Sequence, residues 1–228
     1  MSEPRKVYPI IEGLKASIPG PASETEIALY EGAQYAQLAK ARRARRAEIL
    51  DREMPGELDD IGRRAAVCEM RPHPLSTDLI LSWAGKPASE DGVTPALCVV
   101  GERGVGKTVA AAWWIADTDG RYVLSSELVR LWLTQWGPDR EKWESFKRAR
   151  CLVVDEVGGE RQRPEDVRGM LEDLINARQG AKTRTLYLGN ITSAQWLARL
   201  TARAASRWEA VGYTLELTAR TSMRRRRA

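Results

Sequence analysis

This sequence of 228 residues has few of the residues that build metal sites and disulfide frameworks. It contains one histidine, His73, and three cysteines, Cys68, Cys98 and Cys151, which lie far apart and form no Cys-x-x-Cys pair. This pattern argues against a zinc site or a disulfide scaffold and predicts a protein of the reducing cytoplasm. No segment approaches the ~20 apolar residues of a membrane helix. Residues 1–5 lack the apolar stretch of a secretory signal, so no membrane association is expected.

The composition is that of a soluble globular protein, with 43% hydrophobic and 29% charged residues. The formal net charge of +5 permits nucleic-acid binding, and its distribution matters more than its total. Arginines gather at residues 42–46 and 224–227. The first group either contacts phosphates or forms a solvated helix face, and the sequence leaves both interpretations open.

The composition changes near residue 95, which divides the chain into four expected parts. A helix is expected from the capping residue Ser23 to about Glu53, because the breaker Pro55-Gly56 follows. Shorter helices are expected over residues 58–69 and 77–83. We therefore predict a helical N-terminal region over residues 1–70, a linker over 71–95, a layered core over 96–220 and a basic tail over 221–228.

From residue 96 onward, short apolar runs alternate with longer helical patterns. Strands are predicted over residues 96–100, 122–124, 151–154, 185–188 and 213–217. Helices are predicted between them, over residues 106–116, 126–136, 164–178 and 193–209. Buried strands separated by helices indicate an α/β fold with a parallel five-stranded sheet.

A phosphate-binding loop follows the first of these strands. The segment Gly101-Glu102-Arg103-Gly104-Val105-Gly106-Lys107-Thr108 fills every fixed position of G-x-x-x-x-G-K-[ST] between a strand and a helix. Glycines let consecutive backbone N–H groups surround a phosphate, and the helix N-terminus adds its positive end. Lys107 is expected to reach the β- and γ-phosphates of ATP, and Thr108 to ligate Mg²⁺. The expected nucleotide-binding residues are Gly101, Gly104, Val105, Gly106, Lys107 and Thr108.

Two carboxylates end the next apolar run, which spans residues 151–154. If this strand lies beside the phosphate loop, Asp155 reaches the Mg²⁺ ion, directly or through water. Glu156 then points at the γ-phosphate, where a carboxylate can orient and deprotonate the attacking water.

The order of motifs in the C-terminal half resembles that of the AAA+ ATPases. Within that group it is similar to the DnaC-type helicase loaders and the IstB-type transposition ATPases. The resemblance spans about residues 75–224. Besides the phosphate loop, it rests on Asp155-Glu156-Val157-Gly158, a helix ending in Asn176-Ala177-Arg178, a strand ending in Gly189-Asn190, Ala205-Ser206-Arg207-Trp208, and Thr221-Ser222-Met223-Arg224.

This resemblance implies an AAA+ P-loop NTPase core of three layers without a C-terminal lid. By position, Asn190 polarises the attacking water together with Glu156. Arg207 acts as an arginine finger in the site of a neighbouring subunit, with Arg203 as the alternative. The implied activity is a weak Mg²⁺-dependent ATPase that forms homo-oligomers on ATP binding and is stimulated by assembly or DNA.

Three tryptophans, Trp132, Trp136 and Trp143, lie among cations between the second and third predicted strands. Initiator proteins that this sequence resembles place an extra helical element here, facing single-stranded DNA. Aromatic and cationic side chains suit single strands, because any base can stack and any phosphate can pair. The alternative is that Trp132 and Trp136, four residues apart, belong to the helix core.

Three functions remain open at this stage. The first is a helicase loader in replication initiation, which binds a replicative helicase through residues 1–70. The second is a transposition helper that assembles on DNA and recruits a transposase. The third is a nucleotide-gated adaptor for which ATP turnover is incidental.

Overall fold

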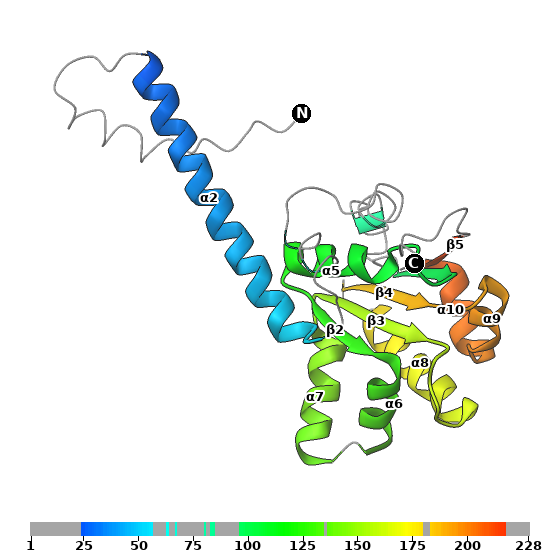
Figure 1. The fold of residues 1–228 in the computed structure, drawn as a ribbon. Coiled ribbons are helices and arrows are strands. Elements are labelled where there is room, and N and C mark those ends of the chain that lie inside the picture. Colours follow the sequence, from blue (N-terminus) through cyan, green and yellow to red (C-terminus); the bar gives the residue numbers. More distant parts are fainter. Residues whose placement is uncertain are drawn as a thin grey trace, which may run out of the picture. The chain divides into compact units, whose positions relative to one another are not determined.

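The computed structural model describes residues 24–56, 96–134, 136–179 and 183–217, together with positions 63, 67, 80 and 83–84 (Figure 1). The predicted cap Ser23 and the basic tail lie outside the described residues. So do the predicted helices over 58–69 and 77–83, apart from those single positions. The chain divides into two compact units, Met1–Arg42 and Arg43–Ala228.

Helix α2 spans Glu24–Glu53, so the predicted end of the first helix is confirmed. Its last turn closes with a hydrogen bond from Met54 N to Leu50 O at 2.9 Å, and Gly56 then takes a left-handed φ of 79°. Within the described part of the chain, no helix is both long and apolar enough to cross a membrane.

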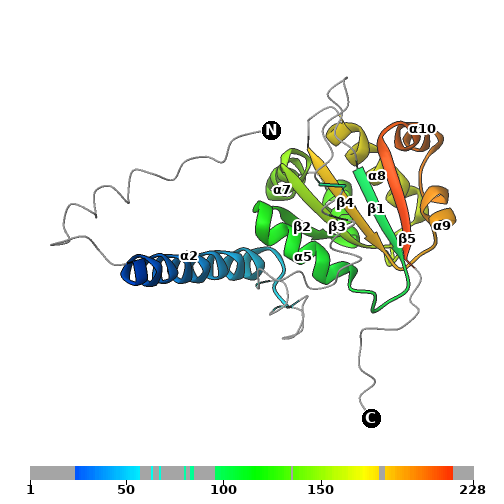
Figure 2. The ribbon, with the colours of Figure 1, turned by 90° about the horizontal axis from the view of Figure 1, so that it is seen from above.

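Five parallel strands form one sheet in the order β2-β3-β4-β1-β5 (Figure 2). The strands are β1 (Ala96–Gly101), β2 (Arg121–Leu124), β3 (Cys151–Val157), β4 (Arg184–Gly189) and β5 (Gly212–Leu217). All five predicted strands and their parallel pairing are confirmed. Since β1 and β4 are neighbours, the loops that follow them meet at the same carboxyl edge of the sheet.

Helices cover both faces of the sheet, which gives three layers (Figure 1). Alternate residues of β1 point to opposite faces: Leu97 and Val99 join the core under α5, and Cys98 and Val100 join the core under the other helices. The predicted burial of Cys98 and Cys151 is confirmed. The helices are α5 (Lys107–Thr118), α6 (Ser125–Thr134), α7 (Gly137–Arg148), α8 (Pro164–Gln179), α9 (Ser193–Ala198) and α10 (Ala202–Val211).

The last turns of α2 belong to the core on the α5 side. Ile49, Leu50 and Met54 are buried there, in one cluster with Trp114. Arg46 is 6% exposed, and its guanidinium lies 4.9 Å from the Trp113 ring centre. Within the arginine group at 42–46, Arg46 is thus a packing residue.

The region from β2 to β3 holds α7 in addition to α6, in agreement with the extra helical element that the resemblance implies here, and Pro138 at the start of α7 begins this second helix. One predicted helix differs from the structure. The predicted helix over 193–209 is two helices, α9 and α10. Thr201 ends the continuity: its hydroxyl accepts a hydrogen bond from Ala204 N at 3.1 Å and caps α10.

Candidate functional site

The phosphate-loop segment lies at the carboxyl edge of the sheet, between β1 and α5. Gly101, Gly104 and Gly106 have φ values of 127°, 86° and 82°, which side-chain-bearing residues rarely adopt. At Gly101, a Cβ atom would lie 2.0 Å from the backbone oxygen of Leu217 in β5, so only glycine fits. Among the described residues, no side chain caps the start of α5, and its first turn holds no acidic residue. Its N-terminal amides therefore suit an anion.

Lys107 lies inside this loop as a buried cation surrounded by neutral oxygens. Its Nζ donates to Gly101 O at 2.9 Å, Glu102 O at 2.8 Å and Asn190 Oδ1 at 3.1 Å. Among the described residues it forms no ion pair. Burial lowers the pKa of the Lys107 amine, while the charge of Asp155 opposes this shift. A buried ammonium group without a carboxylate partner is suited to bind a phosphate anion.

Asp155 on β3 joins the loop through Thr108. The Thr108 hydroxyl donates to Asp155 Oδ2 at 3.0 Å, and the backbone N–H of Glu156 donates to Asp155 Oδ1 at 2.6 Å. Burial raises the pKa of the Asp155 carboxyl group, and these hydrogen bonds oppose the rise. The hydroxyl and carboxylate oxygens are the hard ligands that Mg²⁺ prefers, so the two residues fit this ion.

No group of three or more His, Cys, Asp or Glu residues that could together hold a metal ion occurs in the part of the chain that is described. The donors at the candidate site are Thr108 and Asp155. Mg²⁺ is usually held by one or two carboxylates together with substrate phosphates, whereas zinc needs a cage of protein ligands.

Glu156 follows Asp155 in an unusual backbone conformation. Strand β3 continues past the predicted end to Val157, with an irregular register against β4 between Val154 and Val157. At this irregularity Glu156 has a φ of 57°, and its side chain is exposed. Among the described residues, its carboxylate has no hydrogen-bond partner. It is therefore available to a water molecule or substrate at this edge.

Asn190 meets the phosphate loop from the end of β4. Besides its bond to Lys107, the adjoining Ile191 O accepts a hydrogen bond from Gly101 N at 3.0 Å. A Cβ atom on Gly158 would lie 2.4 Å from Ile191 Cγ2, so this junction also depends on a glycine after β3. Three strand ends thus bring Lys107, Thr108, Asp155 and Asn190 together.

Arg207 and Arg203 lie elsewhere, on α10, which packs against α8 and β5. Arg203 Nη1 lies 3.7 Å from Glu172 Oε1 and is exposed. Arg207 is half-buried, and its Nη1 has no hydrogen-bond partner among the described residues. No hydrogen bond in that part of the chain joins either arginine to the phosphate loop. The role of Arg207 in a neighbouring subunit stays a prediction.

Two polar residues near the site were not singled out in the sequence. Tyr122 on β2 donates its hydroxyl to Asp155 Oδ2 at 3.1 Å. The Glu160 side chain is fully buried and accepts hydrogen bonds from Gly158 N at 2.9 Å and Arg199 Nη1 at 2.9 Å. A tyrosine in the strand that pairs with the acidic strand was the only signal for the first. No sequence signal pointed to Glu160.

The tryptophan-rich segment divides between core and surface. Trp143 is 3% exposed, and Trp132 is half-buried and donates to Asp173 Oδ2 at 2.7 Å. Trp136 is 84% exposed. Two of the interleaved cations, Arg130 and Lys142, form ion pairs with Glu127.

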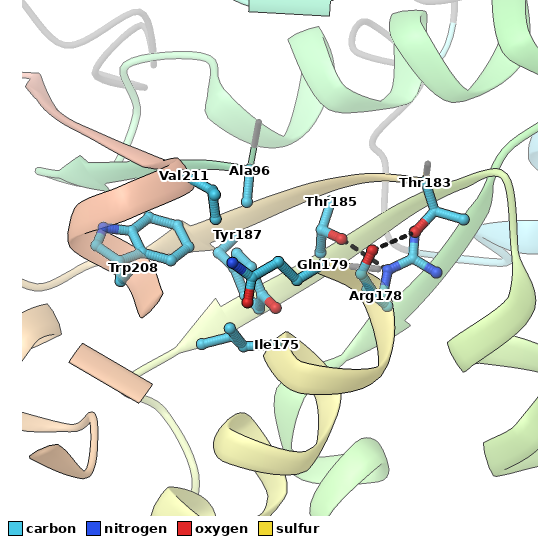
Figure 3. A pocket seen from close by; sticks show the side chains of 9 residues that line it. All are labelled: Ala96, Ile175, Arg178, Gln179, Thr183, Thr185, Tyr187, Trp208 and Val211. Carbon is cyan, nitrogen blue, oxygen red and sulfur yellow. Dashed lines mark hydrogen bonds between the residues drawn. The ribbon is translucent and has the colours of Figure 1, made fainter. Parts of the chain in front are cut away.

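A cavity of about 20 Å³ lies at the amino ends of β1 and β4, remote from the phosphate loop (Figure 3). It has room for about one water molecule and none for a nucleotide. A larger groove of about 740 Å³ runs along the edge strand β2 and includes no phosphate-loop residue. The candidate site is therefore defined by its hydrogen bonds and loop geometry.

No family model and no curated protein matches the sequence. Among solved structures, the fold is similar to DnaI, with 22% identity and a TM-score of 0.50 over 74% of this chain and 92% of that one. It is also similar to a putative primosome component from Streptococcus pyogenes serotype M3, with 15% identity and a TM-score of 0.50 over 80% and 98% of the two chains. The DnaC helicase loader aligns with 21% identity and a TM-score of 0.48 over 70% and 92%. At such identities the likeness concerns the fold alone, an α/β core with a five-stranded parallel sheet in which the phosphate-loop segment joins β1 to α5.

Proposed function

We propose that this protein is a Mg²⁺-dependent ATPase that acts as a helicase loader in replication initiation. The observation that carries the proposal is the set of hydrogen bonds joining Lys107 and Thr108 of the phosphate loop to Asn190 and Asp155 of two other strands. The fold likeness to DnaI and to a primosome component supports the replication context.

The residues of the site divide the chemistry among themselves. Lys107 and the loop amides bind the β- and γ-phosphates, and Thr108 and Asp155 hold Mg²⁺, which neutralises phosphate charge when bound. Glu156 orients the attacking water and accepts its proton, and Asn190 polarises that water. Arg207 completes the site of a neighbouring subunit, so activity requires an oligomer.

The catalytic part of the proposal is tested with Glu156→Gln, with Glu165→Gln as control. Glu165 is an exposed glutamate in the first turn of α8. We expect Glu156→Gln to bind a fluorescent ATP analogue as the wild type does while ATP turnover falls by about 100-fold, the usual contribution of a general base. The control retains both. Absence of Mg²⁺-dependent nucleotide binding in the wild type would refute the proposed activity.

The same variant separates an ATPase from an adaptor. If turnover serves the function, Glu156→Gln binds ATP and forms oligomers but fails to support helicase loading on single-stranded DNA. If Glu156→Gln loads helicase at the wild-type rate, the protein is a nucleotide-gated adaptor.

Partner binding is assigned to the N-terminal region. On α2, Tyr35 is 72% exposed and Leu38 is 58% exposed, three residues apart on one side of the helix. We expect Leu38→Ser in the full-length chain to weaken binding to a hexameric replicative helicase in pull-down and sedimentation assays. Gln37→Ser, on the same helix, is the control. Undiminished helicase binding by Leu38→Ser contradicts this assignment, and DNA-dependent filaments without helicase affinity favour the transposition helper.

The exposed Trp136 is the residue that we assign to single-stranded DNA. Arg140, in the first turns of α7, is exposed as well. Trp136→Ala should weaken binding of a labelled oligonucleotide by about 10-fold, because each stacked base contributes about 1–3 kcal/mol. Leu133→Ala, at another exposed apolar residue of the α6–α7 hairpin, is the control. Equal affinities in fluorescence anisotropy would contradict the assignment.

A further inference from the structure

Tyr122 connects the end of helix α2 with the candidate metal-binding carboxylate. Its side chain is buried, and its hydroxyl donates to Asp155 Oδ2 at 3.1 Å. Its backbone N–H donates to Glu53 Oε2 at 3.2 Å, at the last residue of α2. One residue of the edge strand β2 therefore bonds both to α2 and to the nucleotide site.

The hydroxyl matters because it completes the set of donors around Asp155. Oδ1 accepts the backbone N–H of Glu156, and Oδ2 accepts the hydroxyls of Thr108 and Tyr122. When Thr108 turns its oxygen toward a metal ion, the bond from Tyr122 remains to hold Oδ2. A carboxylate that is fixed by such outer hydrogen bonds presents its lone pair to the ion without a loss of rotational freedom.

We propose that Tyr122 is a positioning residue that orients Asp155 for Mg²⁺, and that Glu53 holds Tyr122 in place from the opposite side. This inference rests on the proposed nucleotide site. It adds a residue outside the P-loop and the acidic motif, and it gives α2 a direct route to the metal-binding carboxylate.

Glu53 binds the start of strand β2 through its buried carboxylate. Its side chain is 6% exposed, and the same Oε2 atom accepts Arg121 Nε at 2.9 Å as well as the N–H of Tyr122. Its other oxygen accepts Arg52 Nε at 2.9 Å. Displacement of this turn of α2 would remove two hydrogen bonds from the start of β2, one of them from Tyr122, the residue that contacts Asp155.

The test uses Tyr122→Phe in the full-length protein, which removes the hydroxyl and keeps the ring. Tyr187→Phe is the matched control, because Tyr187 is a buried strand tyrosine on the opposite face of the sheet. Binding of a fluorescent ATP analogue is titrated with MgCl₂ and repeated in EDTA, and thermal melting measures stability. We expect the half-saturating Mg²⁺ concentration to rise by about 10-fold in Tyr122→Phe, the usual effect of losing an outer-shell partner, with binding in EDTA unchanged.

A half-saturating Mg²⁺ concentration that matches wild type and Tyr187→Phe overturns the inference, because Tyr122 then serves packing alone. Glu53→Ala is the second variant, since it removes the acceptor of the Tyr122 N–H without changing the Tyr122 hydroxyl, Asp155 or the phosphate loop, and it is expected to shift Mg²⁺ dependence in the same direction. If Tyr122→Phe fails to fold, wild-type Mg²⁺ dependence in Glu53→Ala overturns the inference. A wild-type protein that binds no nucleotide refutes the proposed function itself, whereas normal wild-type binding with an unaffected Tyr122→Phe refutes the role of Tyr122 alone.

Discussion

Replacing Arg178 by lysine is expected to destabilise the fold by about 2 kcal/mol while leaving nucleotide binding unchanged. Arg178 is 2% exposed near the end of α8. Its guanidinium donates to Thr185 Oγ1 at 2.6 Å and Arg184 O at 2.7 Å. It also donates to three carbonyls at the end of α7: Phe146 at 2.8 Å, Lys147 at 3.1 Å and Ala149 at 2.8 Å. One side chain thus holds the ends of two helices to the start of β4.

The magnitude follows from counting donors. An ammonium group has three N–H donors, so at least two of these five oxygens lose their partner in Arg178→Lys. Each buried acceptor left without a donor costs about 1 kcal/mol. Burial lowers the pKa of Arg178 to about 10, which shows that the native state already bears a cost for this charge. A lysine at this position still buries a positive charge, but it can replace only part of the hydrogen bonds that stabilise the charge of Arg178.

Chemical denaturation followed by circular dichroism measures the effect. Arg168→Lys is the control, because Arg168 is an exposed arginine of the same helix with one bond, to Ala198 O at 3.2 Å. We expect the control to change the free energy of unfolding by less than about 0.5 kcal/mol. A value for Arg178→Lys equal to that of the control would refute the reasoning. A loss of nucleotide binding in Arg178→Lys would also refute it. Arg178 lies at the amino ends of the strands, whereas the phosphate loop lies at their carboxyl ends, so nucleotide binding should not change.

Three further results are expected. Thr201→Ala should lower the free energy of unfolding by about 1 kcal/mol through loss of the α10 cap, and an unchanged urea midpoint would contradict this. Gly158→Ala should destabilise by about 2 kcal/mol, from a left-handed φ of 96° plus a steric clash. Gly137→Ala, with a φ of 53° and open space around it, should cost less in the same assay. Because burial raises the pKa of the Cys98 and Cys151 thiols, little reactive thiolate exists at pH 8. Peptide mapping should find both thiols modified only after unfolding, and modification of the folded protein would contradict this.

The strands and the phosphate loop could be predicted because local signals agree there. Apolar runs bounded by glycine and charge specify buried strands, and the loop pattern between a strand and a helix specifies the anion site. The end of α2 could be predicted because Pro55-Gly56 cannot continue a helix. In each case neighbouring residues in the sequence determine the outcome.

The missed features depend on contacts between distant residues. The continuation of β3 to Val157 follows from pairing with β4 across an irregular register, and two carboxylates in sequence give no sign of it. Arg46 is buried because its guanidinium donates hydrogen bonds to Trp113 O and Asp117 Oδ1, which lie 67 and 71 residues away in the chain. Tyr122 gained its place in the site from the pairing of β2 with β3. Periodicity alone contains no information about such partners.

Glu53 also bears on the behaviour of the protein at high concentration. Strand β2 is an edge of the sheet, and the unpaired N–H groups of an edge can recruit a strand from another molecule. The carboxylate of Glu53 occupies the N–H of Tyr122, in the middle of this four-residue strand. The negative charge of this carboxylate also disfavours the approach of the backbone carbonyl oxygens of an incoming strand. The same residue that ties a helix to the sheet therefore also occupies an edge donor that could otherwise pair with a strand of another molecule.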